Sequence, residues 1–154
     1  MNTTLKTLTY TIIIAALTFS CGGTKETKND APPPKKMVEK AVDPMENKGI
    51  GPVSSVTIAA EIDQAMADEG KAIFNKLCTA CHKVTKKFIG PSPKDILNRR
   101  SPEWVMNMIM NPDEMTQKDP IAKQLLIEAN GAPMANQNVS EEDARKLLEY
   151  FRTL

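Results

Sequence analysis

Histidine, aromatic side chains and long apolar runs are all scarce in this chain of 154 residues. Aromatic residues make up 5% of the sequence, so other groups must fill a folded core, such as the nine methionines or a bound cofactor. The single histidine excludes a site that needs two imidazoles from one chain. A net charge of +1 gives no bulk attraction to nucleic acid, and we expect none as a partner. Three cysteines cannot all pair within the chain.

The apolar run YTIIIAALTF at 10–19 is too short to span a membrane. As a helix it would reach about 15 Å, roughly half of the hydrocarbon core of a bilayer. We therefore predict that residues 1–20 form a signal peptide. The SCGG that follows resembles the cleavage point of a bacterial lipoprotein signal, which implies diacylation of Cys21. The alternatives are an ordinary signal peptide and an uncleaved anchor. All three place the mature protein outside the cytoplasm, facing the periplasm.

Residues 21–60 are rich in lysine and proline and contain no aromatic residue. A segment of this composition buries too little apolar surface to form a core. Its APPPKK run favours an extended, semi-rigid conformation. We predict a flexible linker that tethers a domain at 61–154 to a membrane through the lipid on Cys21. A disordered tail without this role is the alternative.

Helix signals dominate the sequence after residue 60. In chain order they are an apolar face over 65–77, a second helix that starts at Ser101–Pro102 and ends at Asn111–Pro112, a third from Pro120 to Gly131, and a last one capped by Ser140. No alternating pattern is long enough for a useful strand. The sequence predicts an all-α domain of four to five short helices.

The motif CTACH places Cys78, Cys81 and His82 at i, i+3 and i+4, which is one face of a helical turn. Two thiols at this spacing can bond to the two vinyl groups of a porphyrin, and the next imidazole can reach the iron from the same side. The motif therefore indicates one covalently attached c-type haem. A thioredoxin-like redox pair, a zinc site and a disulfide between the two cysteines are the alternatives. No strand precedes Cys78 and no second histidine is available, so we expect none of them.

Haem iron held by His82 has a second axial position, which a methionine or a small ligand can fill. The candidates are Met66, Met106, Met108, Met110, Met115 and Met134. Met134 differs from the others because it lies in GAPMANQNVS, between the end of one predicted helix and the start of the next. A loop can present a thioether to the face opposite His82. We predict that Met134 is the distal ligand.

Three motifs resemble those of class I monohaem cytochromes c, particularly the small bacterial forms. They are GKAIFNKLCTACH, GPSPKDI and PMANQNVSEEDARKLLEYF, spread over about 63–154. The resemblance implies a cytochrome c fold, with its helices arranged around one covalent haem. It also implies that the first helix crosses the last near Gly70 and Phe74, with Tyr150 opposite.

The same resemblance implies further contacts with the cofactor. The carbonyl of Pro91 is expected to accept a hydrogen bond from the His82 ring and to orient it. Arg99, Arg100 and the indole N–H of Trp104 are expected to meet the haem propionates. A solvated arginine pair at a helix end is the alternative for Arg99 and Arg100.

These features together predict a single-electron carrier, not an enzyme, that is monomeric and exchanges electrons with redox partner proteins. The stretch 83–100 contains six basic residues and only one acidic residue. This basic patch is expected to attract an acidic partner. A small-ligand sensor with an open distal site is one alternative. A dedicated electron-entry subunit of a larger reductase or oxidase is another. Peroxidase chemistry is not expected, because no second histidine can serve as a distal acid–base group.

Overall fold

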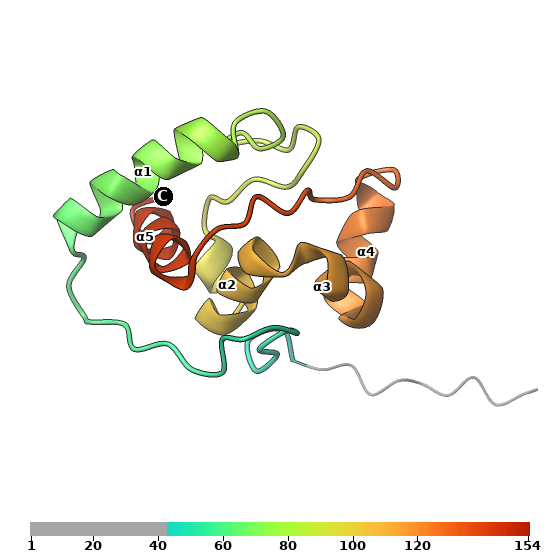
Figure 1. Cartoon of the computed structure of the whole chain (residues 1–154), viewed down its shortest axis with the longest axis horizontal. Coiled ribbons are helices and arrows are strands. Elements are labelled where there is room, and N and C mark those ends of the chain that lie inside the picture. Colours follow the sequence, from blue (N-terminus) through green and yellow to red (C-terminus); the bar gives the residue numbers. More distant parts are fainter. Residues whose placement is uncertain (1–42) are drawn as a thin grey trace, which may run out of the picture. The chain divides into compact units, whose positions relative to one another are not determined.

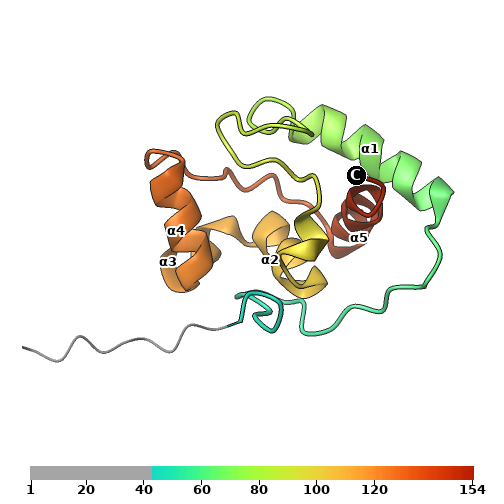
Figure 2. The ribbon, with the colours of Figure 1, turned by 180° about the vertical axis from the view of Figure 1, so that it is seen from behind.

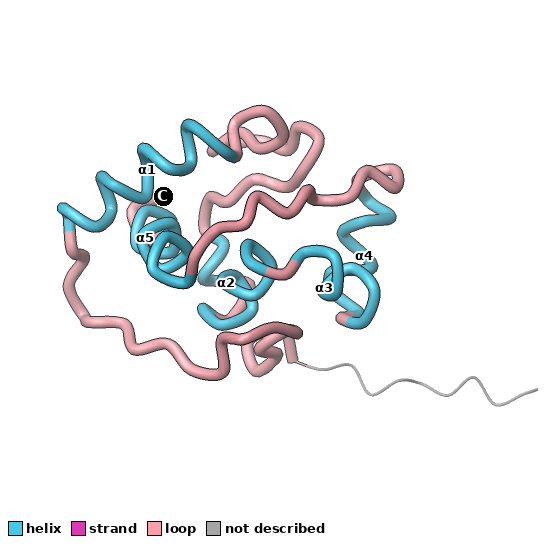
Figure 3. The backbone as a smooth tube through the Cα atoms, viewed as in Figure 1, coloured by secondary structure: helices cyan, strands magenta, loops and turns pink. Residues whose placement is uncertain are grey.

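The computed structural model describes residues 43–154, so the predicted signal peptide, Cys21 and the first part of the predicted linker lie outside the described residues. Five α-helices and one 3₁₀ helix make up the described part of the chain, in which no strand occurs (Figures 1 and 3). They are α1 (Gln64–Leu77), η1 (Ile96–Asn98), α2 (Pro102–Met110), α3 (Pro112–Lys118), α4 (Pro120–Glu128) and α5 (Glu141–Phe151). The all-α prediction is confirmed.

The helix starts follow the capping residues of the sequence. Ser101 accepts a hydrogen bond from the backbone N–H of Trp104 at 3.1 Å, and Ser140 does the same for Asp143 at 3.1 Å. Pro112 does more than end α2: it begins α3, with acidic residues in the first turn that complement the helix dipole. The sequence analysis placed no helix at α3.

Helices α1 and α5 cross at close range, as the resemblance implied (Figure 1). A Cβ at Gly70 would stand 2.5 Å from the carbonyl carbon of Lys146 and closer still to its oxygen, so only glycine permits this approach. The Phe74 and Tyr150 rings pack beside the crossing with their centroids 5.6 Å apart. The crossing fixes the C-terminal end of α1, where the CTACH motif begins.

The segment 43–62, here called the strap, packs along α2 before it enters α1 (Figures 1 and 2). Asn107 of α2 holds it: its side-chain amide donates to the carbonyls of Lys48 and Val53, both at 2.9 Å, and its Oδ1 accepts from the N–H of Val53 at 3.0 Å. Val53 is buried in the main core. Residues 43–60 therefore do not form the flexible linker that the sequence analysis placed there. Side chains of α2 form hydrogen bonds with their backbone groups and hold them against the domain.

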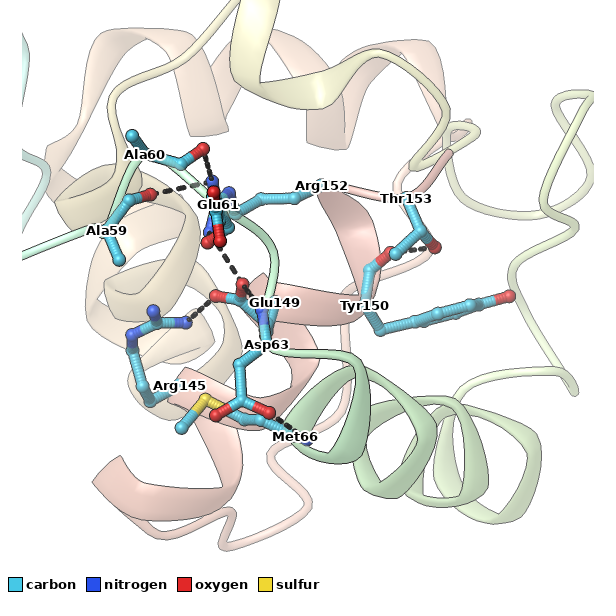
Figure 4. Close-up of polar contacts among 10 residues, drawn as sticks. All are labelled: Ala59, Ala60, Glu61, Asp63, Met66, Arg145, Glu149, Tyr150, Arg152 and Thr153. Carbon is cyan, nitrogen blue, oxygen red and sulfur yellow. Dashed lines mark hydrogen bonds and ion pairs between the residues drawn. The ribbon is translucent and has the colours of Figure 1, made fainter.

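A buried carboxylate fastens the end of the strap to α5 (Figure 4). Glu149 accepts hydrogen bonds from the N–H of Asp63 at 2.9 Å, from Arg145 at 2.6 Å and from Arg152 at 2.5 Å. Arg152 also donates to the carbonyls of Ala59 and Ala60, at 2.8 and 3.2 Å. This junction sets the point at which α1 begins relative to α5.

Candidate functional site

One largely apolar cavity receives residues from every helix of the described chain, together with the loop after α1 and the segment between α4 and α5. The lining residues that bear on chemistry are Cys78, Cys81, His82, Pro91, Trp104, Met108 and Met134. Apolar side chains such as Phe74, Ile109, Leu125 and Leu147 supply most of the remaining wall. Such a cavity suits a large apolar group with a few polar contacts at fixed points.

The CTACH motif lies at one end of this cavity because α1 stops there. Cys78 is the C-cap of α1, and its carbonyl accepts hydrogen bonds from the N–H groups of Cys81 and His82, at 3.1 and 2.9 Å. Burial, and then the neighbouring Cys81, raises the pKa of the Cys78 thiol to about 11. The thiol therefore stays protonated at neutral pH. That is the opposite of the low-pKa thiolate of a redox-active pair.

The alternative readings of the two cysteines find no support in the geometry. Both cysteines are free in the structure. Among residues 43–154, no group of three or more metal-ligating side chains comes together, so the zinc reading lacks its ligands.

His82 is held in one orientation by its neighbours. Its Nδ1 lies 2.7 Å from the carbonyl oxygen of Pro91, the contact expected from the sequence. A carbonyl only accepts, so Nδ1 carries the proton and Nε2 keeps a free lone pair. The backbone of Gly90, which donates to the Cys81 carbonyl at 2.9 Å, lies against the ring. A Cβ there would stand 2.8 Å from both ring nitrogens, so this position requires glycine.

Two of the six candidate methionines line the cavity, Met108 and Met134. Met106 and Met115 are buried in the core instead, with exposed fractions of 2% and 0%. The sulfur of Met115 already accepts a hydrogen bond from the N–H of Ile50 in the strap, at 2.9 Å. Met134 lies outside any helix, in the segment between α4 and α5, as predicted.

The residues predicted to contact the propionates lie in different environments in the structure. Arg99 is exposed, is absent from the cavity lining, and donates to the carbonyls of Ser92 and Lys94, at 3.2 and 2.8 Å. Trp104 lines the cavity, but its indole N–H donates to the carboxylate of Asp119 at 3.1 Å. The N–H that was expected to meet a propionate thus has a buried partner within the chain.

Arg100 keeps an unused donor next to the cavity. Its guanidinium stacks on the Trp104 ring, 5.4 Å from the centroid. Its Nε is buried and finds no hydrogen-bond partner among the described residues. Burial, followed by the charge of Arg99, lowers the pKa of Arg100, while Asp119 and Glu128 act in the opposite direction. A buried donor without an acceptor fits an acidic group supplied by a ligand.

Known proteins with this fold and motif identify the chain's class. The cytochrome c family profile matches residues 67–154, more than half of the chain. A cytochrome c from Rhodothermus marinus shares 45% identity over 67% of this chain and 88% of its own, with a TM-score of 0.65. An engineered form of that protein gives 44% identity over 67% and 89%, with a TM-score of 0.64. Cytochrome c-551 of Stutzerimonas stutzeri is 28% identical over 67% of this chain and 93% of its own length.

The chain belongs to the cytochrome c family. Its cofactor is accordingly one covalently bound c-type haem, and the family supports a haem-based electron carrier. Bacterial members are typically extracytoplasmic. Within residues 43–154, no helix combines the length and apolar character needed to cross a membrane.

The residues present fit this cofactor. The cavity is apolar, two thiols and one imidazole meet at its end, and Arg100 offers a buried donor without an acceptor. Sequence reasoning missed Gly90 and Asp119. The Asp-Pro pair at 119–120 does signal a helix start, but nothing local to it indicates the contact with Trp104.

Proposed function

We propose that this cytochrome c is a single-electron carrier in which Cys78 and Cys81 hold the haem while His82 and Met134 ligate its iron. Bound haem supplies a one-electron Fe(III)/Fe(II) couple. The observation that carries the proposal is the pairing of an oriented imidazole, with Nε2 free, and a methionine outside the helices in one apolar cavity. We propose no catalysis by this site.

The chain's own residues explain why such a site suits electron transfer. Pro91 fixes the tautomer of His82 and raises its basicity through the hydrogen bond at Nδ1. The apolar wall excludes water and disfavours additional positive charge in the cavity, which favours the reduced form. A thioether from Met134 would favour it further. Arg100, rather than Arg99 or Trp104, is the residue we propose for binding a propionate.

We propose a docking surface for redox partners beside the cavity. Phe88, Ile89 and Ile127 are exposed by 54%, 44% and 68%. Phe88 and Ile89 lie in the loop after α1, and Ile127 lies on α4. The two segments are joined where Lys87 donates to the carbonyl of Glu128 at 2.7 Å, and Ile89 also lines the cavity. Lys83 stacks on Phe88, 5.1 Å from the ring centroid. An apolar patch with a basic border suits a partner that carries an acidic border.

We further propose that the carrier is a monomer tethered to a bacterial membrane and facing the periplasm. The support is the sequence alone: a signal peptide at 1–20 and a lipid on Cys21, followed by a linker that is now shorter than expected. Radioactive palmitate incorporated into the expressed protein, and lost in Cys21→Ser, would test the anchor. Equal labelling of both proteins would contradict it.

Replacement of the two cavity methionines tests the ligation. Matured Met134→Leu is expected to lose the weak far-red band of Met-bound Fe(III) and to bind carbon monoxide readily when reduced. Met108→Leu, which alters the same cavity, is expected to keep the unmutated spectrum. A Met134→Leu spectrum that stays low-spin and indifferent to carbon monoxide would overturn the assignment. A high-spin spectrum in the unmutated protein would favour the ligand-sensor reading.

A further inference from the structure

Asp119 is a buried carboxylate directly behind the cavity wall. It begins α4 as the N-cap residue, and only 2% of its surface is exposed. The side chain does not itself line the cavity, but two of its hydrogen-bond partners, Trp104 and Ala122, do. A charge at this position therefore acts on the cavity across one layer of side chains.

All the groups that hydrogen-bond to Asp119 are neutral. Its Oδ1 accepts from the indole N–H of Trp104 at 3.1 Å and from the backbone N–H of Ala122 at 2.8 Å. Its Oδ2 accepts from the side-chain amide of Asn47 at 2.6 Å. Within residues 43–154, no cation forms an ion pair with it. Neutral donors stabilise the carboxylate without cancelling its charge.

Asp119 and the cation Arg100 both contact Trp104. Arg100 stacks on the Trp104 ring, and the charge of Asp119 acts against the lowering of the Arg100 pKa. Asp119 thus interacts favourably with the guanidinium charge, and it places its own negative charge behind the wall. In a low-dielectric interior both effects reach further than they would in water.

We propose that Asp119 sets the reduction potential of the bound haem. A negative charge behind the cavity wall stabilises the oxidised iron, which carries one more positive charge than the reduced iron, and so lowers the potential. The hydrogen bond to Trp104 fixes the position of this charge, and the hydrogen bond from Asn47 links it to the strap. The inference rests on the proposed electron-transfer function but not on the identity of the distal ligand.

Asp119→Asn removes the charge with little change of shape, because asparagine is an equally good N-cap and keeps an acceptor for Ala122 and Trp104. It loses only the hydrogen bond from the Asn47 amide, because its own amide nitrogen then faces that donor. Asp63→Asn is the matched control: Asp63 caps α1, accepts from the N–H of Met66 at 3.0 Å, is exposed and does not line the cavity. Spectroelectrochemical titration of the matured proteins is expected to give a higher potential for Asp119→Asn and an unchanged potential for Asp63→Asn. Equal potentials in the two variants would overturn the proposal.

A charge swap keeps the test available if Asp119→Asn matures poorly. In Asn47→Asp with Asp119→Asn, the amide at 119 donates to a carboxylate at 47, so the hydrogen bond is restored with its direction reversed. The charge moves outward to the strap, and the potential is expected to lie between those of the unmutated protein and Asp119→Asn. If folding recovers and the potential returns fully to the unmutated value, the hydrogen bond matters rather than the place of the charge, and the proposal fails.

The two proposals fail in different measurements. A wrong distal ligand appears in the visible spectrum of the unmutated protein and in its response to carbon monoxide. A wrong role for Asp119 leaves that spectrum intact and appears only as an unshifted potential.

Discussion

At the scale of single residues, the orientation of His82 depends on a glycine that has no room for a side chain. In Gly90→Ala the new Cβ would overlap the imidazole, because it would lie 2.8 Å from both ring nitrogens. The ring must turn, which breaks its 2.7 Å hydrogen bond to Pro91. We expect a mixed-spin visible spectrum and a loss of about 1–3 kcal/mol in the free energy of unfolding, the usual cost of overpacking.

Gly131→Ala is the control for this variant. Gly131 has a φ of +79° and no atom within contact distance of an added Cβ. The substitution strains the backbone at the end of α4, far from His82 in sequence, and we expect lower stability with an unchanged spectrum. If both variants keep the unmutated spectrum, steric support of the imidazole by Gly90 is excluded.

Local sequence motifs predicted some of the site residues but not those that meet only through folding. Cys78, Cys81 and His82 lie within five residues, where spacing alone sets their geometry, whereas the contact between Pro91 and His82 was implied by the resemblance to class I cytochromes c. Asp119 and Trp104 are 15 residues apart and meet only because α2 and α4 pack around the same cavity. The resemblance implied a hydrogen bond from the indole to a propionate, and nothing in the sequence indicated Asp119 as a partner.

At the scale of helices, capping residues predicted where most elements begin. Ser101, Ser140 and the prolines at 102 and 120 all mark helix starts in the structure. Helix α3 was missed because Asn111–Pro112 was interpreted only as an end, although Asp113 and Glu114 also suit a first turn. The strap was missed for another reason: many of its hydrogen bonds go to side chains from distant parts of the chain, such as Asn107 of α2 and Met115 of α3, and such pairing leaves no periodic pattern in the strap itself.

The Glu149 junction couples folding of α5 to pH. Burial alone would raise the pKa of Glu149, but the Asp63 N–H, the hydrogen bond from Arg145 and the charges of Arg145 and Arg152 together hold it below its ordinary value of 4.5. A carboxyl whose pKa falls on folding stabilises the folded state above its unfolded pKa, and this stabilisation is lost as pH falls through the folded value. We expect the free energy of unfolding to decrease with acidification below about pH 4.5.

Glu149→Gln should remove this contribution. At pH 7 we expect a loss of about 2–3 kcal/mol, because two arginines are left without their buried carboxylate. Below pH 4.5 the difference from the unmutated protein should shrink. Urea unfolding at a series of pH values measures both effects. Glu142→Gln, an exposed carboxylate on the same helix, should change stability little. A constant difference between Glu149→Gln and the unmutated protein at every pH would argue against the ionic role of Glu149.

At the scale of the whole molecule, charge is distributed unevenly although the net charge is only +1. The loop from Cys81 to the start of α2 carries Lys83, Lys86, Lys87, Lys94 and the two arginines, and the same loop lines the cavity. Acidic residues concentrate elsewhere, on α1, α3 and α5. The sequence predicted this separation, because the basic run is continuous along the chain. It could not predict that exposed Phe88 and Ile127 would accompany it, since Phe88 lies in the loop after α1 and Ile127 lies on α4, two segments joined only by folding.

The uneven charge predicts how the reduced protein reacts with small oxidants. Ferricyanide is an anion, so its attraction to the basic loop should make oxidation fast at low salt and progressively slower as ionic strength rises. Lys86→Gln with Lys87→Gln should slow the low-salt reaction several-fold and flatten its salt dependence, because two exposed positive charges beside the cavity are removed.

The control for this variant is Lys71→Gln with Lys123→Gln, which removes the same charge from α1 and α4 and should change the slope less. Stopped-flow oxidation between about 10 and 300 mM salt separates the two variants, because the Debye length shortens from about 30 Å to less than 8 Å over that range. Equal slopes in both would mean that net charge, rather than the basic loop, steers the encounter.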